Sequence, residues 1–397
     1  SQHRVATAEE VSAMCALVRE AMAAGAIGLG SSTAEAHVGE GGLPVASRLA
    51  DRSEFLALTQ AMGESGRGLF QITIGPKTTL EDLREIWRVS GRPAIWAAFF
   101  QRDDRPEYVP ERLAITEAFH REGVEVVPQI SCRPLTMDFT MKNPYPFEGM
   151  PAWQAVMKEP ESRWLHVYGD PAFRAALKAD LDARRFAVFR GRWDLVQVLR
   201  THRPEHKPLE GQSLADLARE TGKHPVDAWL DLVTADGLDV EFLAGLLNTD
   251  ETVVGDLIVH PLTLITLSDA GAHLSLMCDA GYSSTLLGKW VRRLERLPLE
   301  AAVKRLTDDP ARAYRIPQRG RLQPGCWADV AIFDPATVDA LPVEWVTDLP
   351  GGEGRFVSRA RGVEWSLVNG RPVLERGRVV EQPAGRRPGQ VLRRFDP

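Results

Sequence analysis

The sequence predicts an α/β fold, a β/α barrel of the TIM type followed by a small β-rich portion. Short apolar runs alternate with helical patterns between residues 26 and 130, which is typical of parallel β/α units. Several of these runs stop abruptly at polar residues, as barrel strands do where an active site is built. Beyond residue 317 the pattern changes to strands, with an Asn-Gly hairpin turn at Asn369.

The elements follow in order from local start and stop signals. The first helix opens with a capping box, in which Thr7 is followed three residues later by Glu10, and it ends at Gly25. Apolar periodicity then separates strands from helices. We predict strands at 26–30, 69–74, 94–100, 124–130, 195–199, 240–246 and 263–267, and helices at 53–65, 79–90, 111–121, 212–221, 225–234, 282–294 and 298–309.

The domain organisation is predicted as a barrel over residues 1–317 and a β-sandwich portion over 318–397. Residues 141–194 interrupt the alternation with aromatic residues and prolines, among them Tyr145, Trp153 and Trp164. We interpret this stretch as a lid-like insertion over the barrel mouth. A surface subdomain that only packs against the barrel is an equally open alternative.

Composition excludes several functional classes. The formal net charge is −6 and no block of Lys and Arg is long enough to follow a phosphate backbone, so we expect no nucleic-acid partner. No apolar run approaches membrane-spanning length, so we expect no membrane partner. The four cysteines are scattered without a C-x-x-C pair, which favours a reducing compartment and a cytoplasmic location.

A carboxylate follows the most clearly buried strand. Residues 263–267 are apolar or β-branched and are followed by Ser-Asp-Ala-Gly-Ala-His, so Asp269 lies just past a strand's carboxyl end. Such an Asp can hold a metal and accept the proton of a bound water. Capping of the next helix is the alternative. Metal-ligand partners are scarce, because the chain contains neither His-x-His nor H-E-x-x-H.

Polar residues also end two neighbouring strands. Gln101 follows the strand at 94–100, and Gln129 and Arg133 end the strand at 124–130. Because parallel barrel strands deliver their carboxyl ends to one face, we expect these side chains to share a cavity with Asp269. Arg133 could bind a substrate carboxylate through two hydrogen bonds, or it could form a structural ion pair.

Three segments resemble a known family. Residues 267–273 (LSDAGAH), with 278–282 (CDAGY) after them, resemble the last-strand motif of amidohydrolase family three, which includes the N-acyl-D-amino-acid deacylases, or D-aminoacylases. Residues 25–30 (GAIGLG) resemble the family's GALG strand. Residues 320–330 (GRLQPGCWADV) resemble its G-x-L-x-x-G-x-x-A-D return into the β-sandwich. The resemblance covers essentially the whole chain.

The resemblance implies a metallo-dependent hydrolase barrel that cleaves a linear amide, with N-acyl-D-amino acids as the first candidates. It implies a divalent metal, zinc by preference, with Asp269 as a ligand and as the general base. Most other metal ligands are expected outside this chain. The residues that we assign to substrate binding are Arg133, Gln101, Gln129, His273 and Tyr282.

Departures from the family pattern leave a second function open. The family's His-x-His belongs upstream of the GALG strand, and this chain starts too late to contain it. We therefore expect an incomplete, open barrel that lacks its first strands and is a poor hydrolase alone. The alternative is a non-catalytic barrel that serves as a binding or assembly subunit. Formation of a homo-oligomer is left open.

Overall fold

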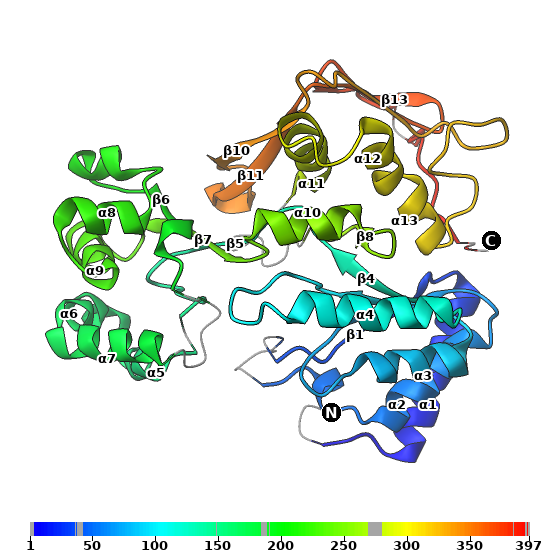
Figure 1. Ribbon diagram of the computed structural model, residues 1–397, viewed down its shortest axis with the longest axis horizontal. Helices are drawn as coiled ribbons and strands as arrows, with labels where there is room; N and C mark the ends of the chain where they lie inside the picture. The colour runs from blue at the N-terminus through cyan, green and yellow to red at the C-terminus, as the bar shows by residue number, and fades with distance from the viewer. Residues whose placement is uncertain are drawn as a thin grey trace.

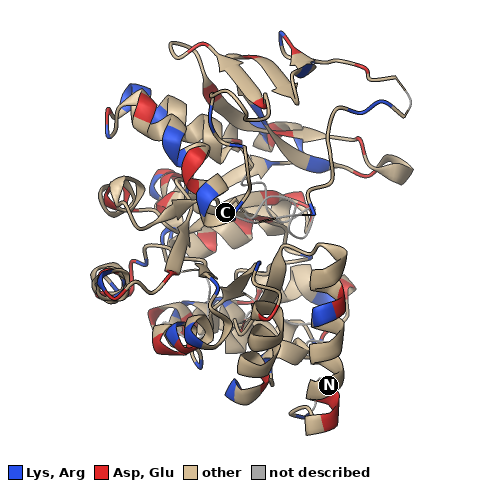
Figure 2. Cartoon of the chain, turned by 90° about the vertical axis from the view of Figure 1, so that its right-hand side faces the viewer, with Lys and Arg blue, Asp and Glu red and all other residues tan. Residues whose placement is uncertain are grey.

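A computed structural model describes residues 4–35, 37, 43–147, 149–183, 189, 191–268, 280–383, 385–393 and 395. Three parts are visible in Figure 1: a parallel sheet with its helices, a separate group of helices and short strands, and a C-terminal β region. Acidic and basic residues are interspersed along the helices (Figure 2). None of the described helices combines the length and the apolar character needed to cross a membrane.

The first part is a five-stranded parallel sheet in the order β1-β2-β3-β4-β8, which confirms the predicted α/β fold. In the described part of the chain, β1 and β8 each pair with a neighbour on one side only. The strands are β1 (Gly28–Ser32), β2 (Leu69–Thr73), β3 (Ala94–Ala97), β4 (Val126–Ile130) and β8 (Leu264–Ile265). The helices are α1 (Ala8–Ala24), η2 (Ala46–Arg48), α2 (Arg52–Gly63), α3 (Leu80–Ser90), α4 (Tyr108–Arg121), α10 (Glu251–Val259), α11 (Tyr282–Thr285), η6 (Leu286–Arg293), α12 (Leu299–Leu306) and α13 (Asp308–Ala313).

Helix boundaries follow the local signals in the sequence. The Thr7 side chain accepts from the backbone N–H of Glu10, whose carboxylate accepts from the Thr7 N–H, so the predicted capping box of α1 is confirmed. The helix ends at Gly25, whose φ of 102° suits glycine. Asp51 caps α2 in the same manner, by accepting from the Glu54 N–H.

The two faces of the parallel sheet have different neighbours. Phe70, Ile72 and Trp96 belong to the large core that lies between the sheet and its helices. Leu69, Ile95 and Leu264 form a smaller apolar layer on the opposite, concave face. This division follows from the strand period of two, which sends alternate side chains to opposite faces.

The second part is a three-stranded antiparallel sheet in the order β5-β7-β6, covered by helices. It spans residues 135–247 and is wider than the predicted insertion at 141–194. The strand predicted at 240–246 exists as β7, but it pairs with β5 and β6 instead of joining the parallel sheet. The elements are β5 (Leu135–Phe139), α5 (Pro151–Val156), η3 (Glu161–Arg163), α6 (Trp164–Gly169), α7 (Pro171–Asp182), η4 (Trp193–Leu195), β6 (Val196–Arg200), η5 (Pro204–Leu209), α8 (Leu214–Thr221), α9 (Pro225–Asp236) and β7 (Glu241–Leu247).

We call residues 135–247 the insertion, because its core is its own. All buried residues of this hydrophobic cluster lie between Met137 and Leu246. Trp153 and Trp229 are fully buried at its centre, with ring centroids 5.7 Å apart. Their burial accounts for much of the apolar area that this part removes from water.

The third part contains two small antiparallel sheets, β10-β11 and β14-β13-β12-β9. The predicted hairpin turn at Asn369 and Gly370 is confirmed, with φ of 49° and 78° as a type I′ turn requires. The elements are β9 (Val330–Phe333), β10 (Asp339–Val346), η7 (Pro350–Gly352), β11 (Arg355–Arg361), β12 (Val363–Val368), β13 (Arg371–Glu375) and β14 (Arg378–Val379).

Candidate active site

A buried polar layer lies on the concave face of the parallel sheet. Gln129 on β4 is only 4% exposed, and its side-chain amide donates to Thr266 Oγ1 at 2.9 Å and to the Tyr314 hydroxyl at 3.2 Å. Gln71 on β2 donates to Gln129 Oε1 at 3.1 Å. These bonds join β2, β4, the chain just after β8 and the end of α13. Because Gln129 is buried and its half-buried partners are all bonded to it, the layer fixes the relative positions of these strands.

Gln101 links the end of β3 to the segment that follows β7. Its side-chain oxygen accepts from the backbone N–H groups of Thr249 (2.9 Å) and Asp250 (3.1 Å), and its side-chain nitrogen donates to Asp103 (2.6 Å). The side chain is 6% exposed. Gln101 is therefore placed at the predicted edge of the sheet, where its amide holds the start of α10.

Asn248 connects the same segment to the end of β4. Its side-chain amide donates to the carbonyl oxygens of Ser131 (2.9 Å) and Arg133 (2.8 Å), while its oxygen accepts from the Gln101 N–H (3.3 Å). Asn248 is 2% exposed and has a φ of 62°. Asparagine is one of the few residues that tolerate this left-handed conformation.

Arg133 faces the residues that follow the predicted catalytic segment. Its guanidinium donates to the carbonyl oxygen of Ala280, and it lies close to Gly281, whose φ is 84°. The structure thus brings Arg133 to the carboxyl end of β4, next to the predicted residue Tyr282. Figure 1 shows this end of β4 beside α10 and β8.

Tyr282 and Cys132 form a buried contact below this edge. The Cys132 thiol donates to the Tyr282 carbonyl oxygen at 3.1 Å, and the Trp290 indole donates to the Cys132 carbonyl oxygen at 2.7 Å. Burial raises the pKa of Cys132 to about 12 and also raises the pKa of Tyr282. These two bonds hold the buried Cys132 between β4 and the helix that begins at Tyr282.

Asp269 and His273 lie outside the described residues, together with the rest of 269–279. The chain is described up to Ser268, three residues after β8 ends at Ile265. β8 is parallel to β4, so it delivers Ser268 to the same sheet edge as Ser131 and Arg133. The assignment of Asp269 as base and metal ligand stays a prediction, as does substrate binding by His273.

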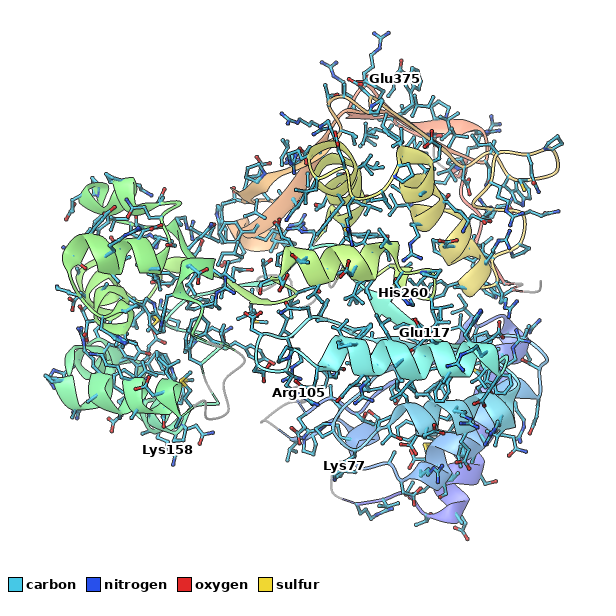
Figure 3. All side chains as sticks on the ribbon, in the orientation of Figure 1. Lys77, Arg105, Glu117, Lys158, His260 and Glu375 are labelled. Carbon is cyan, nitrogen blue, oxygen red and sulfur yellow. The ribbon has the colours of Figure 1, made fainter. Side chains whose placement is uncertain are left out.

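The described side chains do not fit a divalent metal. Outside 269–279 and the other undescribed positions, no three His, Cys, Asp or Glu side chains gather around one point. His260, at the end of α10, lies 3.2 Å from Glu117 of α4, and both lie in the helical layer away from the sheet edge (Figure 3). His206 bonds to Asp236 inside the insertion.

Three members of the polar layer and one linker were not singled out from the sequence: Gln71, Thr266, Tyr314 and Asn248. The position of Thr266 could have been predicted, because it lies two residues after Leu264 and the strand period of two places both side chains on the same face of the sheet. Asn248 also carried one, as an asparagine at the end of an apolar run. Tyr314 carried none, since only the packing of α13 brings its hydroxyl to Gln129.

Comparison with known proteins gives a consistent relationship. A model of the amidohydrolase family matches residues 2–374. The chain is 34% identical to N-acyl-D-glutamate deacylase of Alcaligenes xylosoxydans xylosoxydans over 193 residues, which are 48% of this chain and 35% of that protein. It is 32% identical to D-aminoacylase of the same organism, over 45% of this chain and 34% of that protein. The matched parts thus make up about a third of these relatives.

Solved structures show the same fold. A crystal structure of D-aminoacylase covers 96% of this chain with a TM-score of 0.60 and 22% identity, and 66% of that chain is matched. N-acyl-D-glutamate deacylase from Bordetella bronchiseptica, complexed with zinc and a phosphonate inhibitor, covers 99% of this chain with a TM-score of 0.60 and 23% identity, and 68% of that chain is matched. With the family match over residues 2–374, these likenesses show that the chain belongs to the amidohydrolase family.

Proposed function

We propose that the protein represented by this chain hydrolyses a linear amide, most suitably an N-acyl-D-amino acid, to a carboxylate and a free amino acid. The observation that carries the proposal is the family match over residues 2–374. Two relatives that each match a little under half of this chain are named N-acyl-D-glutamate deacylase and D-aminoacylase. The sheet edge described above supports the proposal, because the described chain reaches Ser268, next to Asp269 in the sequence, at the carboxyl end of the strands, where barrel enzymes carry their chemistry.

In this proposal Asp269 is the general base. It accepts a proton from the attacking water and returns it to the leaving amine. A divalent metal, with zinc as the first candidate, is part of the proposal. The described side chains do not provide its ligand set, so the other ligands are expected outside the described residues.

The remaining predicted residues receive supporting roles. Arg133 lies at the sheet edge, and its planar guanidinium matches the geometry of a substrate carboxylate. Gln101 and Gln129 are bonded within the protein, so we assign Gln101 to holding the start of α10 at the end of β3 and Gln129 to holding β4 beside the chain after β8. His273 and Tyr282 complete the proposed substrate contacts. The scattered cysteines support a cytoplasmic location.

The test uses the complete gene product and measures release of free amine. N-acetyl-D-glutamate, N-acetyl-D-aspartate and N-acetyl-D-leucine are compared with their L-enantiomers, and bound metal is measured on the same preparation. We expect at least one D-substrate to be hydrolysed. This activity should be lost when the metal is chelated and should return when zinc is added. Absence of turnover for every D- and L-substrate, in a folded and metal-loaded protein, would contradict it.

One observation favours a second candidate, a non-catalytic binding or assembly subunit. The described residues contain no cluster of three metal-ligating side chains. Such a subunit needs no bound cation. Purified complete protein with less than one metal ion in about ten molecules after zinc loading, combined with no amine release, would support this second candidate over the hydrolase.

A further inference from the structure

A cavity lies between the parallel sheet and helices α2 and α3, on the face of the sheet opposite the polar layer. It has a volume of about 290 Å³ and opens where the loops after β1 and β2 meet α2 and α3. The described residues that line it are Thr33, Glu35, Pro44, Arg48, Leu49, Ala50, Arg52, Phe55, Leu56, Ile72, Pro76, Lys77, Thr78, Asp82 and Ile86.

The floor of this cavity is apolar. Ile72 and Ile86 are 1% and 3% exposed, and Phe55 and Leu56 of α2 complete the floor. Ile72 points toward the helices, because it alternates along β2 with Gln71, which faces the polar layer. The sheet itself therefore separates this cavity from the candidate active site.

The rim carries the charged groups. Arg52 is neutralised, since it pairs with Asp82 at 3.1 Å and with Glu85. Asp82 also accepts from the Thr79 N–H at 2.8 Å as part of the capping box of α3. Two cations remain: Arg48 at the end of η2 and Lys77 on the loop after β2, and both line the cavity.

The partners of these two cations are weak or absent in the described part of the chain. Arg48 donates to the carbonyl oxygen of His37 at 3.3 Å and forms no ion pair with any described residue. Among the described residues Lys77 forms no hydrogen bond or ion pair, and it is exposed at the start of the loop into α3 (Figure 3). Glu35 is the one rim carboxylate that is also without an ion pair there. Among the described rim residues without an ion pair, two are cations and one is an acid, which favours a ligand with an anionic head group.

We propose that this cavity binds a medium-chain aliphatic carboxylate, with its alkyl chain on the floor and its carboxylate between Arg48 and Lys77. At about 30 Å³ for each water-sized group, the volume suits a ligand of about ten non-hydrogen atoms, which is the size of octanoate. The apolar floor excludes a compact, highly charged ligand such as phosphate, because such an ion would leave the floor uncovered. The inference does not rest on the proposed deacylase activity.

The experiment measures binding of octanoate to the full chain by isothermal titration calorimetry. Octan-1-ol and octylamine have the same chain length and serve as neutral and cationic probes. Octanoate is expected to bind with a stoichiometry of one, and octylamine at least about tenfold more weakly, because its ammonium would face Arg48 and Lys77. The affinity for octan-1-ol is expected to lie between the affinities for octanoate and octylamine.

Three variants connect the binding to the cavity. Lys77→Gln removes one positive charge from the rim. It is expected to weaken octanoate binding about threefold, because one partly exposed ion pair contributes about that much, and to leave the affinity for octan-1-ol unchanged. Lys158→Gln removes an equally exposed lysine from the insertion and is expected to change neither (Figure 3). Ala50→Phe puts a ring into the cavity from its half-buried wall and is expected to weaken both ligands.

Circular dichroism of each variant confirms that it is folded before its affinity is compared. The proposal is overturned by any of three results in folded protein: no saturable octanoate binding, equal affinity for octanoate and octylamine, or unchanged octanoate affinity in Ala50→Phe. Equal losses in Lys77→Gln and Lys158→Gln would also overturn it, because they would indicate a general charge effect.

Discussion

At the scale of single residues, the side chain of Asn248 connects three segments of the chain. It bonds to β3 through the Gln101 N–H and to the end of β4 through two carbonyl groups. We expect Asn248→Ala to lower the free energy of unfolding by about 3 kcal/mol, since three buried polar groups lose a partner. Chemical denaturation followed by tryptophan fluorescence measures this loss.

Asn248→Gly separates the contribution of the side-chain hydrogen bonds from that of the left-handed backbone conformation. Glycine accepts a φ of 62° without strain but cannot replace the amide, so it should recover only the conformational part, about 1 kcal/mol. If glycine restored full stability, the three hydrogen bonds would contribute nothing and the conformation alone would matter.

Asp269 is the residue on which the proposed chemistry depends. Asp269→Asn in the complete protein should lower turnover at least about a hundredfold, the low end for general-base catalysis, and leave the melting temperature nearly unchanged. Steady-state kinetics with the best D-substrate measures the effect. Ser268→Ala, at the neighbouring position, is the matched control and should retain most of the activity. Near-normal turnover in Asp269→Asn would remove this residue from the mechanism.

The positions of the candidate residues followed from the sequence, whereas their bonding did not. Gln101, Gln129 and Arg133 were predicted at strand ends, because a strand's end is a local signal. The partners of Gln101 are the backbone N–H groups of Thr249 and Asp250. No local pattern links residues so far apart in the chain, and backbone donors have no sequence signature. For that reason the holding role of Gln101 emerged only from the fold.

At the scale of secondary structure, α1 shows how a local charge pattern controls a helix end. Hydrogen bonds from Arg4 and from the Thr7 N–H lower the pKa of Glu10 from 4.5 to about 2. A lowered pKa means that the folded helix end favours the carboxylate. The stabilisation is therefore complete above about pH 4.5 and is lost as the pH falls toward 2.

We expect amide hydrogen exchange at Thr7 and Glu10 to accelerate between pH 4.5 and 2, after correction for intrinsic exchange rates. Glu10→Gln should exchange rapidly at all pH values, because its neutral amide cannot replace the ion pair with Arg4. Glu9→Gln, which changes the adjacent residue outside the capping box, is the control. A pH profile that is the same in Glu10→Gln and in the unaltered chain would contradict this explanation.

Strands illustrate what local patterns leave undecided. The run at 240–246 was predicted as a strand and is one, yet its partners are the antiparallel strands β5 and β6. Alternating burial along β7 would suit either kind of sheet, because the period of two is common to both. Sheet membership depends on distant pairing, so the insertion's true extent could not be read from its own residues.

At the scale of the whole molecule, two separate hydrophobic cores divide the chain. One lies between the parallel sheet and its helices, and the other lies wholly within the insertion. Leu135 and Leu247, at the base of the insertion, pack against the buried residues Ala97, Phe100 and Leu267. Polar contacts also cross between the parts. Arg192 of the insertion pairs with Asp103 after β3 at 3.1 Å, and Arg200 of β6 lies 4.0 Å from the ring centre of Trp345 on β10. Exposed polar contacts of this kind contribute little stability, so the coupling between the two cores is expected to come mainly from the apolar cluster at the base of the insertion.

The neck of the insertion has a consequence for engineering this chain. Leu135 and Leu247 are paired neighbours on β5 and β7, so the chain leaves and re-enters at almost one point. A short Asn-Gly link could join these two positions. We expect a gene lacking codons 136–246, with that link in their place, to yield a protein that still melts cooperatively, as differential scanning calorimetry would show. Failure to fold would mean that the sheet depends on the removed segment. A folded but inactive product would instead indicate that an exchangeable cassette supplies substrate selection, which could then be swapped between relatives.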